Sequence, residues 1–289
     1  MRTDAFSKCH PAVNFVFFVG AIGSAVLIQH PAYLLAGVAC SGLYVALLLR
    51  RGKLLLSMLP VFLVLTAINP LFNTYGETLL FSCFGRPYTL EALYYGAAVA
   101  AIFVQMLLWL NCCTAVLTSD RFTTLFGNLI PALSLLLVMV LRMLPSLFRK
   151  ARQLSGARSA IGKGGKETGG DKLREGMTLL GALTSWALEG SVVTADSMRS
   201  RGYGSGKHTS FMRYTMKPSD WALLILQLLL LTAVLVFGNT AATYTPNLSV
   251  APLGGVSALG FAAYCAYLLL PSALHIKEVL QWHNSISKI

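Results

Sequence analysis

Long apolar runs separated by short polar breaks dominate the chain. A helix needs about 17–25 apolar residues to cross a hydrocarbon core of about 30 Å. Six runs approach or meet that length, and we expect each to form a membrane-spanning helix: Ala12–Ile28, Tyr33–Leu49, Leu54–Ile68 (which can continue to Phe72), Leu90–Leu117, Trp221–Phe237 and Val256–Leu270. The segment Asn69–Thr89 is rich in turn formers, so we expect it to lie outside the hydrocarbon as a short hairpin.

A seventh apolar run, Leu125–Leu141, decides the topology. If it crossed the membrane, the next segment, Arg142–Lys217, would lie outside with 14 Lys and Arg against five Asp and Glu, which violates the positive-inside rule. If it does not cross, both termini are cytoplasmic, Arg86 is the one basic residue in the external loops, and the other 22 lie inside. We therefore expect six spans and an apolar helix at the membrane surface, covered by other protein. The alternative, a re-entrant pair formed by Leu90–Leu117, is weaker because nothing in that run breaks the helix.

The composition agrees with a membrane protein. Of the 289 residues, 55% are hydrophobic and 12% are charged, whereas soluble domains carry about 25% charged residues. The net charge of +12 is typical of cytoplasmic loops in a membrane protein rather than of nucleic-acid binding. The predicted fold class is an all-α integral membrane protein. Its first four spans occupy residues 1–118, a cytoplasmic helical block occupies 119–218, and two further spans with a cytoplasmic tail occupy 219–289.

Few residues offer chemistry of their own. The six cysteines show no metal-ligand spacing, and most lie in apolar runs, where cysteine behaves as a small hydrophobic residue. The 11 acidic residues are scattered, whereas a membrane-embedded lipid-modifying enzyme would cluster Asp, Glu or His. Charges and helix breaks are nearly absent from the spans, which disfavours a stand-alone transporter. We expect no catalytic residue, no metal and no cofactor bound by this chain.

The cytoplasmic block predicts two helices. The first carries "RMLPSLFRKARQLSGARSAIG", in which Arg142 and Pro145 mark an expected bend. The second runs from about Asp171 to Arg201, with one apolar stripe and a C-capping glycine after its last turn. The stripe is formed by Leu179, Leu183, Trp186 and Val193, and the capping residue is Gly202.

The glycine- and lysine-containing sequence at the end of each predicted helix resembles a phosphate-binding loop. Gly156, Gly162 and Lys163 have the spacing of such a loop, but Gly164 replaces the required hydroxyl and a basic helical segment precedes it. Instead, each helix is expected to end in a small residue, an arginine and another small residue. Arginine offers a planar, permanently charged fork to carboxylates or carbonyls. The two tips are Ala157-Arg158-Ser159 and Ser200-Arg201-Gly202.

These two segments carry a resemblance to a known family. "RMLPSLFRKARQLSGARSAIG" is similar to the "R-F-I-P … A-x-x-A-R-G" coupling segment of the transmembrane T component of energy-coupling factor (ECF) transporters, the family that includes the CbiQ-type cobalt-importer subunit. "ADSMRSRGYG" is similar to its second signature. The order of four spans, a cytoplasmic block and a further span also resembles the family. Ser159 replaces the family's glycine, Ser200 replaces its alanine, and the last span exceeds the five-span minimum.

The resemblance implies a non-catalytic subunit of an ATP-driven importer of a vitamin or a transition metal in the bacterial plasma membrane. Arg158 and Arg201 would anchor the tips in two ABC ATPases, which bind the ATP and Mg²⁺. The apolar faces of the block, with Leu179, Leu183, Trp186 and Val193, would contact a membrane substrate-binding S component. A conventional ABC permease is the closest alternative, but it usually offers one coupling element per copy and pairs with itself.

Overall fold

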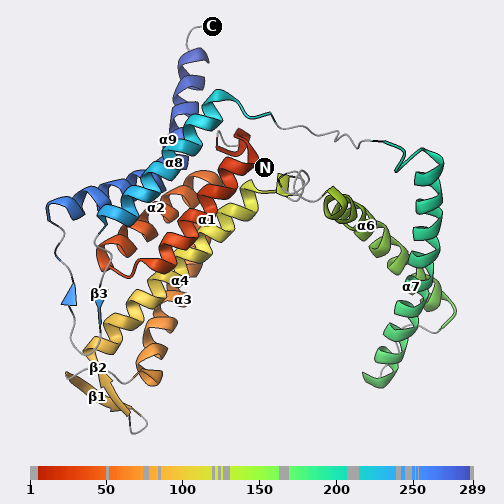
Figure 1. Cartoon of the computed structure of the whole chain (residues 1–289). Helices are drawn as coiled ribbons and strands as arrows, with labels where there is room; N and C mark the ends of the chain where they lie inside the picture. The colour runs from red at the N-terminus through yellow and green to blue at the C-terminus, as the bar shows by residue number, and fades with distance from the viewer. Residues whose placement is uncertain are drawn as a thin grey trace. The chain divides into compact units, whose positions relative to one another are not determined.

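Helices make up nearly all of the regular structure of the chain (Figure 1). The computed structural model describes residues 6–49, 52–73, 78–83, 86–118, 121–122, 125, 131–162, 169–206, 215–238, 242–244, 249–250, 252 and 254–286. The helices are α1 (Pro11–Leu27), α2 (Pro31–Leu49), α3 (Gly52–Phe72), α4 (Leu90–Val116), α6 (Pro131–Ala160), α7 (Gly169–Ser200), α8 (Pro218–Phe237) and α9 (Val256–Ile286), preceded by a short 3-10 helix, Phe6–Lys8.

Each of the six apolar runs expected to span forms a helix close to its predicted bounds, except that α9 continues past the predicted Leu270 to Ile286. Five of them, α2, α3, α4, α8 and α9, are long and apolar enough to cross a membrane. The remaining one, α1, is also apolar but has 17 residues. The expected hairpin after α3 is present as two antiparallel strands, β1 (Leu79–Cys83) and β2 (Arg86–Thr89). A second, smaller pair, β3 (Ala242–Thr243) and β4 (Ser249–Val250), lies between α8 and α9.

The chain divides into two compact units. One contains Met1–Phe122 and Tyr214–Ile289 and is called the bundle unit; the other contains Thr123–Arg213 and is called the two-helix unit. In the bundle unit α4 packs against α1, α2 and α3, while α9 packs against α2 and α8. In the two-helix unit α6 packs against α7. The predicted start of the helix over Leu125–Leu141 lies partly outside the described residues, since α6 is described from Pro131.

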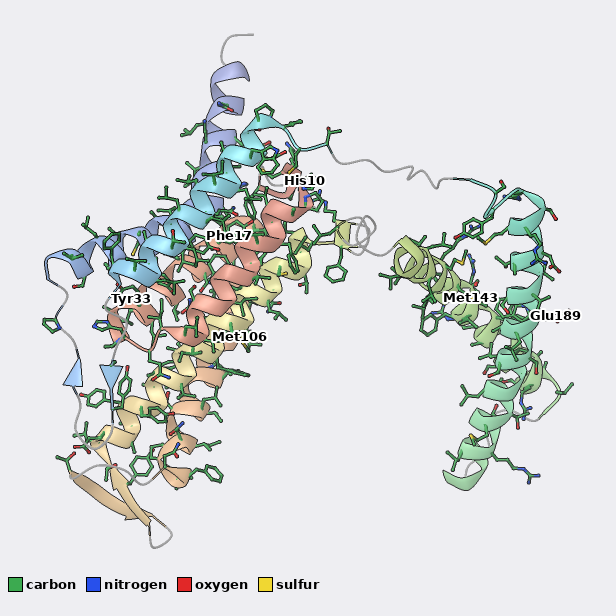
Figure 2. All side chains as sticks on the ribbon, viewed as in Figure 1. His10, Phe17, Tyr33, Met106, Met143 and Glu189 are labelled. Atoms are coloured by element: carbon green, nitrogen blue, oxygen red, sulfur yellow. The ribbon has the colours of Figure 1, made fainter. Side chains whose placement is uncertain are left out.

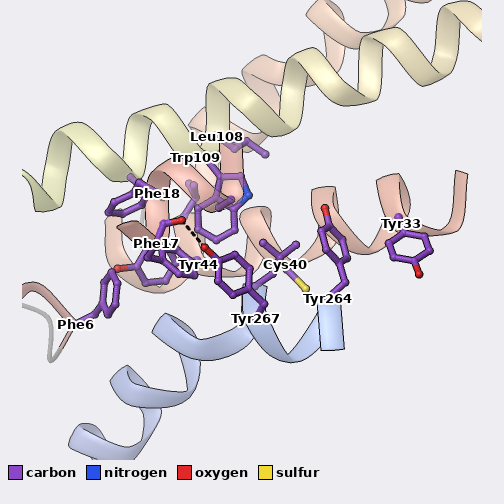
Figure 3. Close-up of a cluster of buried hydrophobic side chains, with 14 of the residues drawn as sticks. Phe6, Phe17, Phe18, Tyr33, Cys40, Tyr44, Leu108, Trp109, Tyr264 and Tyr267 are labelled. Atoms are coloured by element: carbon purple, nitrogen blue, oxygen red, sulfur yellow. Dashed lines mark hydrogen bonds between the residues drawn. The ribbon is translucent and has the colours of Figure 1, made fainter. Parts of the chain in front are cut away.

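Aromatic side chains fill the core of the bundle unit (Figure 3). The rings of Phe17 and Trp109 meet edge to face with centroids 5.4 Å apart, a favourable arrangement for aromatic pairs. The ring centroid of Tyr267 on α9 lies 5.2 Å from that of Phe17. The Tyr267 hydroxyl also donates to the backbone carbonyl oxygen of Phe17 over 2.9 Å. This bond links the last helix of the chain to the first.

Small residues allow the helices of the bundle unit to approach closely. A Cβ atom at Gly37 would lie 2.5 Å from the amide carbon of Gln105 on α4, and one at Gly96 would lie 2.9 Å from a backbone oxygen of α3. The sequence marks both glycines, with Gly20 and Gly23, as sites of close helix contact. Gly23 is the exception, because a Cβ there would meet nothing within 4 Å.

Side chains cap several helices of the bundle unit. His10 and His30 each precede a proline at an end of α1, a position that the sequence marks as a turn rather than a ligand site. Each accepts at its Nδ1 the backbone N–H of the residue two positions later, Ala12 or Ala32, over 3.2 and 3.3 Å. The sequence places Asp220 at the end of a predicted span, where solvent or headgroups could reach it, but in the structure it is only 5% exposed. Its Oδ2 accepts the backbone N–H of Lys217 over 3.1 Å, which ties the carboxylate to the first turn of α8.

Candidate functional site

The two helices of the two-helix unit leave much of their apolar surface uncovered. Figure 2 shows side chains along α6 and α7 that project away from both helices. A pair of helices can cover only one stripe of each, so the other apolar side chains stay open to a further partner. The exposed ones are Leu136, Val138, Val140, Leu144 and Phe148 on α6, and Leu173, Met177, Leu180, Leu188, Val192 and Val193 on α7.

The stripe predicted on α7 divides between two environments. Leu179, Leu183 and Trp186 are half-buried, and the Lys150 ammonium of α6 lies 6.0 Å from the centre of the Trp186 ring, at the limit of a cation–π contact. Val193 is 63% exposed. Because α6 packs against α7 in this unit, we infer that the first three side chains face α6. The open apolar surface of α7 lies beside this stripe.

The C-terminal end of α7 has the hydrogen-bond pattern of a Schellman motif. The N–H of Gly202 donates to the Arg199 oxygen and the N–H of Tyr203 to the Met198 oxygen, both over 3.0 Å. Gly202 has a φ of 81°, a left-handed conformation that costs glycine nothing. The expectation that Gly202 caps this helix is confirmed. Arg201, the last residue before the cap, is exposed.

The end of α6 shares part of this geometry, a few residues later than the sequence indicates; Lys163, which would donate the second bond of the motif, lies outside the described residues. The N–H of Gly162 donates to the Ser159 oxygen over 3.1 Å, and Gly162 has a φ of 74°. The N–H of Ile161 donates to the Ala157 oxygen over 3.3 Å, as that of Arg201 does to the Ser197 oxygen over 3.1 Å. The bonding therefore pairs Gly162 with Gly202 and Ile161 with Arg201.

This register differs from the sequence-based alignment of the two tips. Ser159 does not end α6, which continues to Ala160, because the first residue able to take the left-handed conformation without cost is Gly162. Arg158 lies within the last turn and is half-buried; its Nε is buried and has no hydrogen-bond partner among the described residues. Arg158 and Arg201 thus occupy different positions relative to their caps.

The expected bend falls within a continuous helix. Pro145 lies inside α6, where its missing N–H leaves the Leu141 carbonyl without its usual helical donor. The Ser146 hydroxyl donates to the Met143 oxygen over 2.7 Å. Arg142 and Pro145 are both exposed, so either can meet a partner.

The described part of the phosphate-loop spacing has no matching structure, while Lys163 and Gly164 lie outside the described residues. Gly156 lies inside α6 and Gly162 ends it, whereas a phosphate loop lies between a strand and a following helix. Across the described part of the chain, no group of three or more His, Cys, Asp or Glu could hold a metal ion.

The bundle unit contains buried amides that the sequence analysis missed. Asn14, Gln105 and Gln227 are at most 1% exposed, on α1, α4 and α8. The Gln105 Nε2 donates to the Tyr264 hydroxyl over 3.0 Å, but its Oε1 has no partner within the described residues. Both polar atoms of Asn14 and of Gln227 also lack a partner there. The sequence marks Asn14, Gln105 and Gln227 as amide residues within predicted spans. It does not show which face of its helix each amide occupies, so their burial could not be predicted.

Comparison with known proteins adds no identification, since no family model and no curated protein matches the chain.

Proposed function

We propose that this chain is the transmembrane coupling subunit, or T component, of an ECF-type ABC importer. The observation that carries the proposal is the two-helix unit itself. It presents a wide uncovered apolar surface together with capped helix ends, one of which carries a solvent-exposed arginine. Such surface is typical of a protein interface. The similarity of "RMLPSLFRKARQLSGARSAIG" and "ADSMRSRGYG" to the coupling segments of that family supports the same reading.

The proposed topology has six spans and cytoplasmic termini in a bacterial plasma membrane. The two-helix unit then lies on the cytoplasmic side, with its excess of basic residues, as the positive-inside rule requires. We count α1 as a span in addition to the five longer helices, because its 17 residues are at the lower limit for crossing. Its aromatic side chains pack against α4 and α9, which supports a path through the bundle alongside them.

In this proposal the two-helix unit acts as a lever. The ends of α6 and α7 dock on two ABC ATPases, which bind ATP and Mg²⁺. The exposed apolar faces hold an S component, the membrane subunit that binds a vitamin or a transition metal. Ser200 lies 14 residues beyond Trp186, or about 21 Å along the helix axis. A displacement at the tip is therefore passed through rigid helix to the contact between α6 and α7, and would tilt the S component.

Co-purification with co-expressed, tagged ABC ATPases tests the proposal. The double variant Arg158→Glu/Arg201→Glu is expected to insert normally in the membrane but to lose both ATPases and substrate uptake. Arg149→Glu is the matched control, because it reverses an exposed arginine of α6 away from the tip and should retain both ATPases. Full ATPase binding by the double variant would disprove the coupling role.

A stand-alone transporter is the second candidate, and the buried amides favour it. Polar groups without partners inside a membrane bundle are costly and often mark a solute path. Purified chain in lipid vesicles distinguishes the two candidates. The coupling proposal predicts no uptake without ATPases and an S component, whereas a stand-alone transporter would accumulate or exchange its solute alone.

A further inference from the structure

The chain leaves the bundle unit beside the 3-10 helix that precedes α1. Phe122 is the last residue of the bundle unit, and Arg121 next to it is half-buried. The Arg121 Nη1 donates to the backbone carbonyl oxygen of Ser7, in the 3-10 helix, and to that of Val116 over 3.3 Å. Val116 ends α4, and a cation there can bond carbonyls that lack a helical donor. Arg121 therefore joins the end of α4 to the 3-10 helix.

The 3-10 helix that accepts this bond is itself fixed in the core of the bundle unit. Phe6 is 0% exposed, and its ring meets those of Phe17 and Phe18 edge to face, with centroids 5.2 and 6.1 Å apart (Figure 3). Ser7 is also buried. The bond from Arg121 to the Ser7 carbonyl thus attaches the chain to the core of the bundle.

The residue after Arg121 makes a second contact with the same part of the bundle unit. The ring of Phe122 meets that of Phe15 on α1 edge to face, with centroids 6.4 Å apart. The Phe122 N–H donates to the Thr118 oxygen over 3.0 Å. An arginine that only reached lipid headgroups would direct its guanidinium away from the protein, whereas Arg121 bonds two protein carbonyls. Two neighbouring side chains therefore hold the chain directly before the two-helix unit begins.

We propose that Arg121 is a positioning residue that keeps this end of the two-helix unit fixed to the bundle unit while the ATPases move the ends of α6 and α7. A lever tilts only when one point of it is held. Without the clamp formed by Arg121 and Phe122, the five residues 117–121 can span up to about 17 Å when extended. They would then absorb the displacement, and the whole two-helix unit would move with the ATPases. This inference rests on the proposed coupling function, because it takes the ATPases as the source of the movement.

Hydrogen exchange measured by mass spectrometry on the full chain in detergent tests the clamp. Arg121→Met should speed exchange in the peptide 117–122 about tenfold or more, because a hydrogen bond from a charged donor shifts a local opening equilibrium by about that factor. Arg121→Lys keeps a charged donor and should exchange closer to the wild-type rate. Phe122→Ala, which removes the ring contact with Phe15, should also speed exchange in this peptide.

Lys8→Met is the matched control, because it removes a cation from the 3-10 helix without touching the clamp. The Lys8 side chain is 55% exposed and pairs with Glu278 of α9. Exposed ion pairs contribute little to stability. Exchange in the peptide 117–122 should therefore stay at the wild-type rate in this variant.

A second measurement follows the same peptide in the full chain bound to co-expressed ABC ATPases, with and without ATP and vanadate. In the wild type, exchange should be equally slow in both states, because the clamp stays closed while the ATPases move. In Arg121→Met it should become faster still with ATP and vanadate, although both ATPases stay bound. The inference is overturned if ATP and vanadate speed exchange in the wild type, or if Arg121→Met exchanges at the wild-type rate. If the wild-type chain captures no ATPase, the proposed function fails and the role of Arg121 in the lever fails with it, whereas exchange in the chain alone still shows whether the clamp exists.

Discussion

The close contact between α8 and α9 gives a sharp prediction for Gly260→Ala. A Cβ atom at Gly260 would lie 2.5 Å from both Cα and N of Gly238, and 2.7 Å from the carbonyl carbon of Phe237. Carbon atoms in van der Waals contact are about 3.5–4.0 Å apart, so the overlap is about 1 Å. The obstructing atoms are backbone, and no rotamer change relieves the clash. The end of α8 and the start of α9 must separate.

Overpacking of this kind costs about 1–3 kcal/mol. With the entropy of unfolding of a domain of this size, that cost lowers the melting temperature by about 3–10 °C. Melting can be followed in detergent with a thiol-reactive fluorophore, because Cys40 and Cys112 are buried in the folded bundle and react on unfolding. Gly23→Ala is the matched control, since it lies in a helix and meets nothing within 4 Å. Equal melting temperatures for Gly260→Ala and the wild type would refute the contact.

Three further substitutions test separate features. Gly37→Ala should displace the Gln105 amide, break its bond to α9 and lower stability by about 1 kcal/mol in the same melting assay; an unchanged melting temperature would contradict the contact. Gly202→Ala should cost about 1–2 kcal/mol in the α7 cap, because the φ of Gly202 is 81°. Limited proteolysis near the cap should therefore be faster in this variant. Gly190→Ala is the control, because Gly190 lies in the helix interior with open space around it, and this variant should leave the proteolysis rate unchanged. The Tyr244 hydroxyl donates to a carbonyl of the loop after α1 over 2.6 Å, and because burial raises its pKa, this donor persists at mildly alkaline pH. Tyr244→Phe should lose about 1 kcal/mol, and an equal melting temperature would show that this bond adds nothing.

Most helices of the bundle unit could be predicted from length and hydropathy, although α9 continues past the predicted Leu270 to Ile286. The run over Leu90–Leu117, for example, becomes α4 from Leu90 to Val116. Contacts between helices were less accessible. Gly37 and Gly23 look alike in the sequence, yet only Gly37 has a neighbouring helix against its backbone. Glycine spacing shows where helices can approach, and the rotation of each helix decides where they do.

Of the two helix caps, the one at the end of α7 could be predicted from the sequence, whereas the one at the end of α6 lies at a different residue than the sequence indicates. Gly202 was recognised as a cap because a glycine follows an arginine-ended helical pattern directly. At the first tip the sequence has Ser159 in place of glycine, and the helix instead continues until Gly162 removes the steric cost of the left-handed turn. The motif alone could not show this, because serine and alanine both remain compatible with helix.

The mass of the solubilised complex, measured by native mass spectrometry, tests the central claim most directly. The account predicts one 31.2 kDa copy of this chain bound to two ABC ATPases, and loss of both ATPases from the Arg158→Glu/Arg201→Glu variant. A complex with two copies of this chain and two ATPases would instead indicate a conventional ABC permease. A chain that carries no ATPase at all would contradict the coupling role.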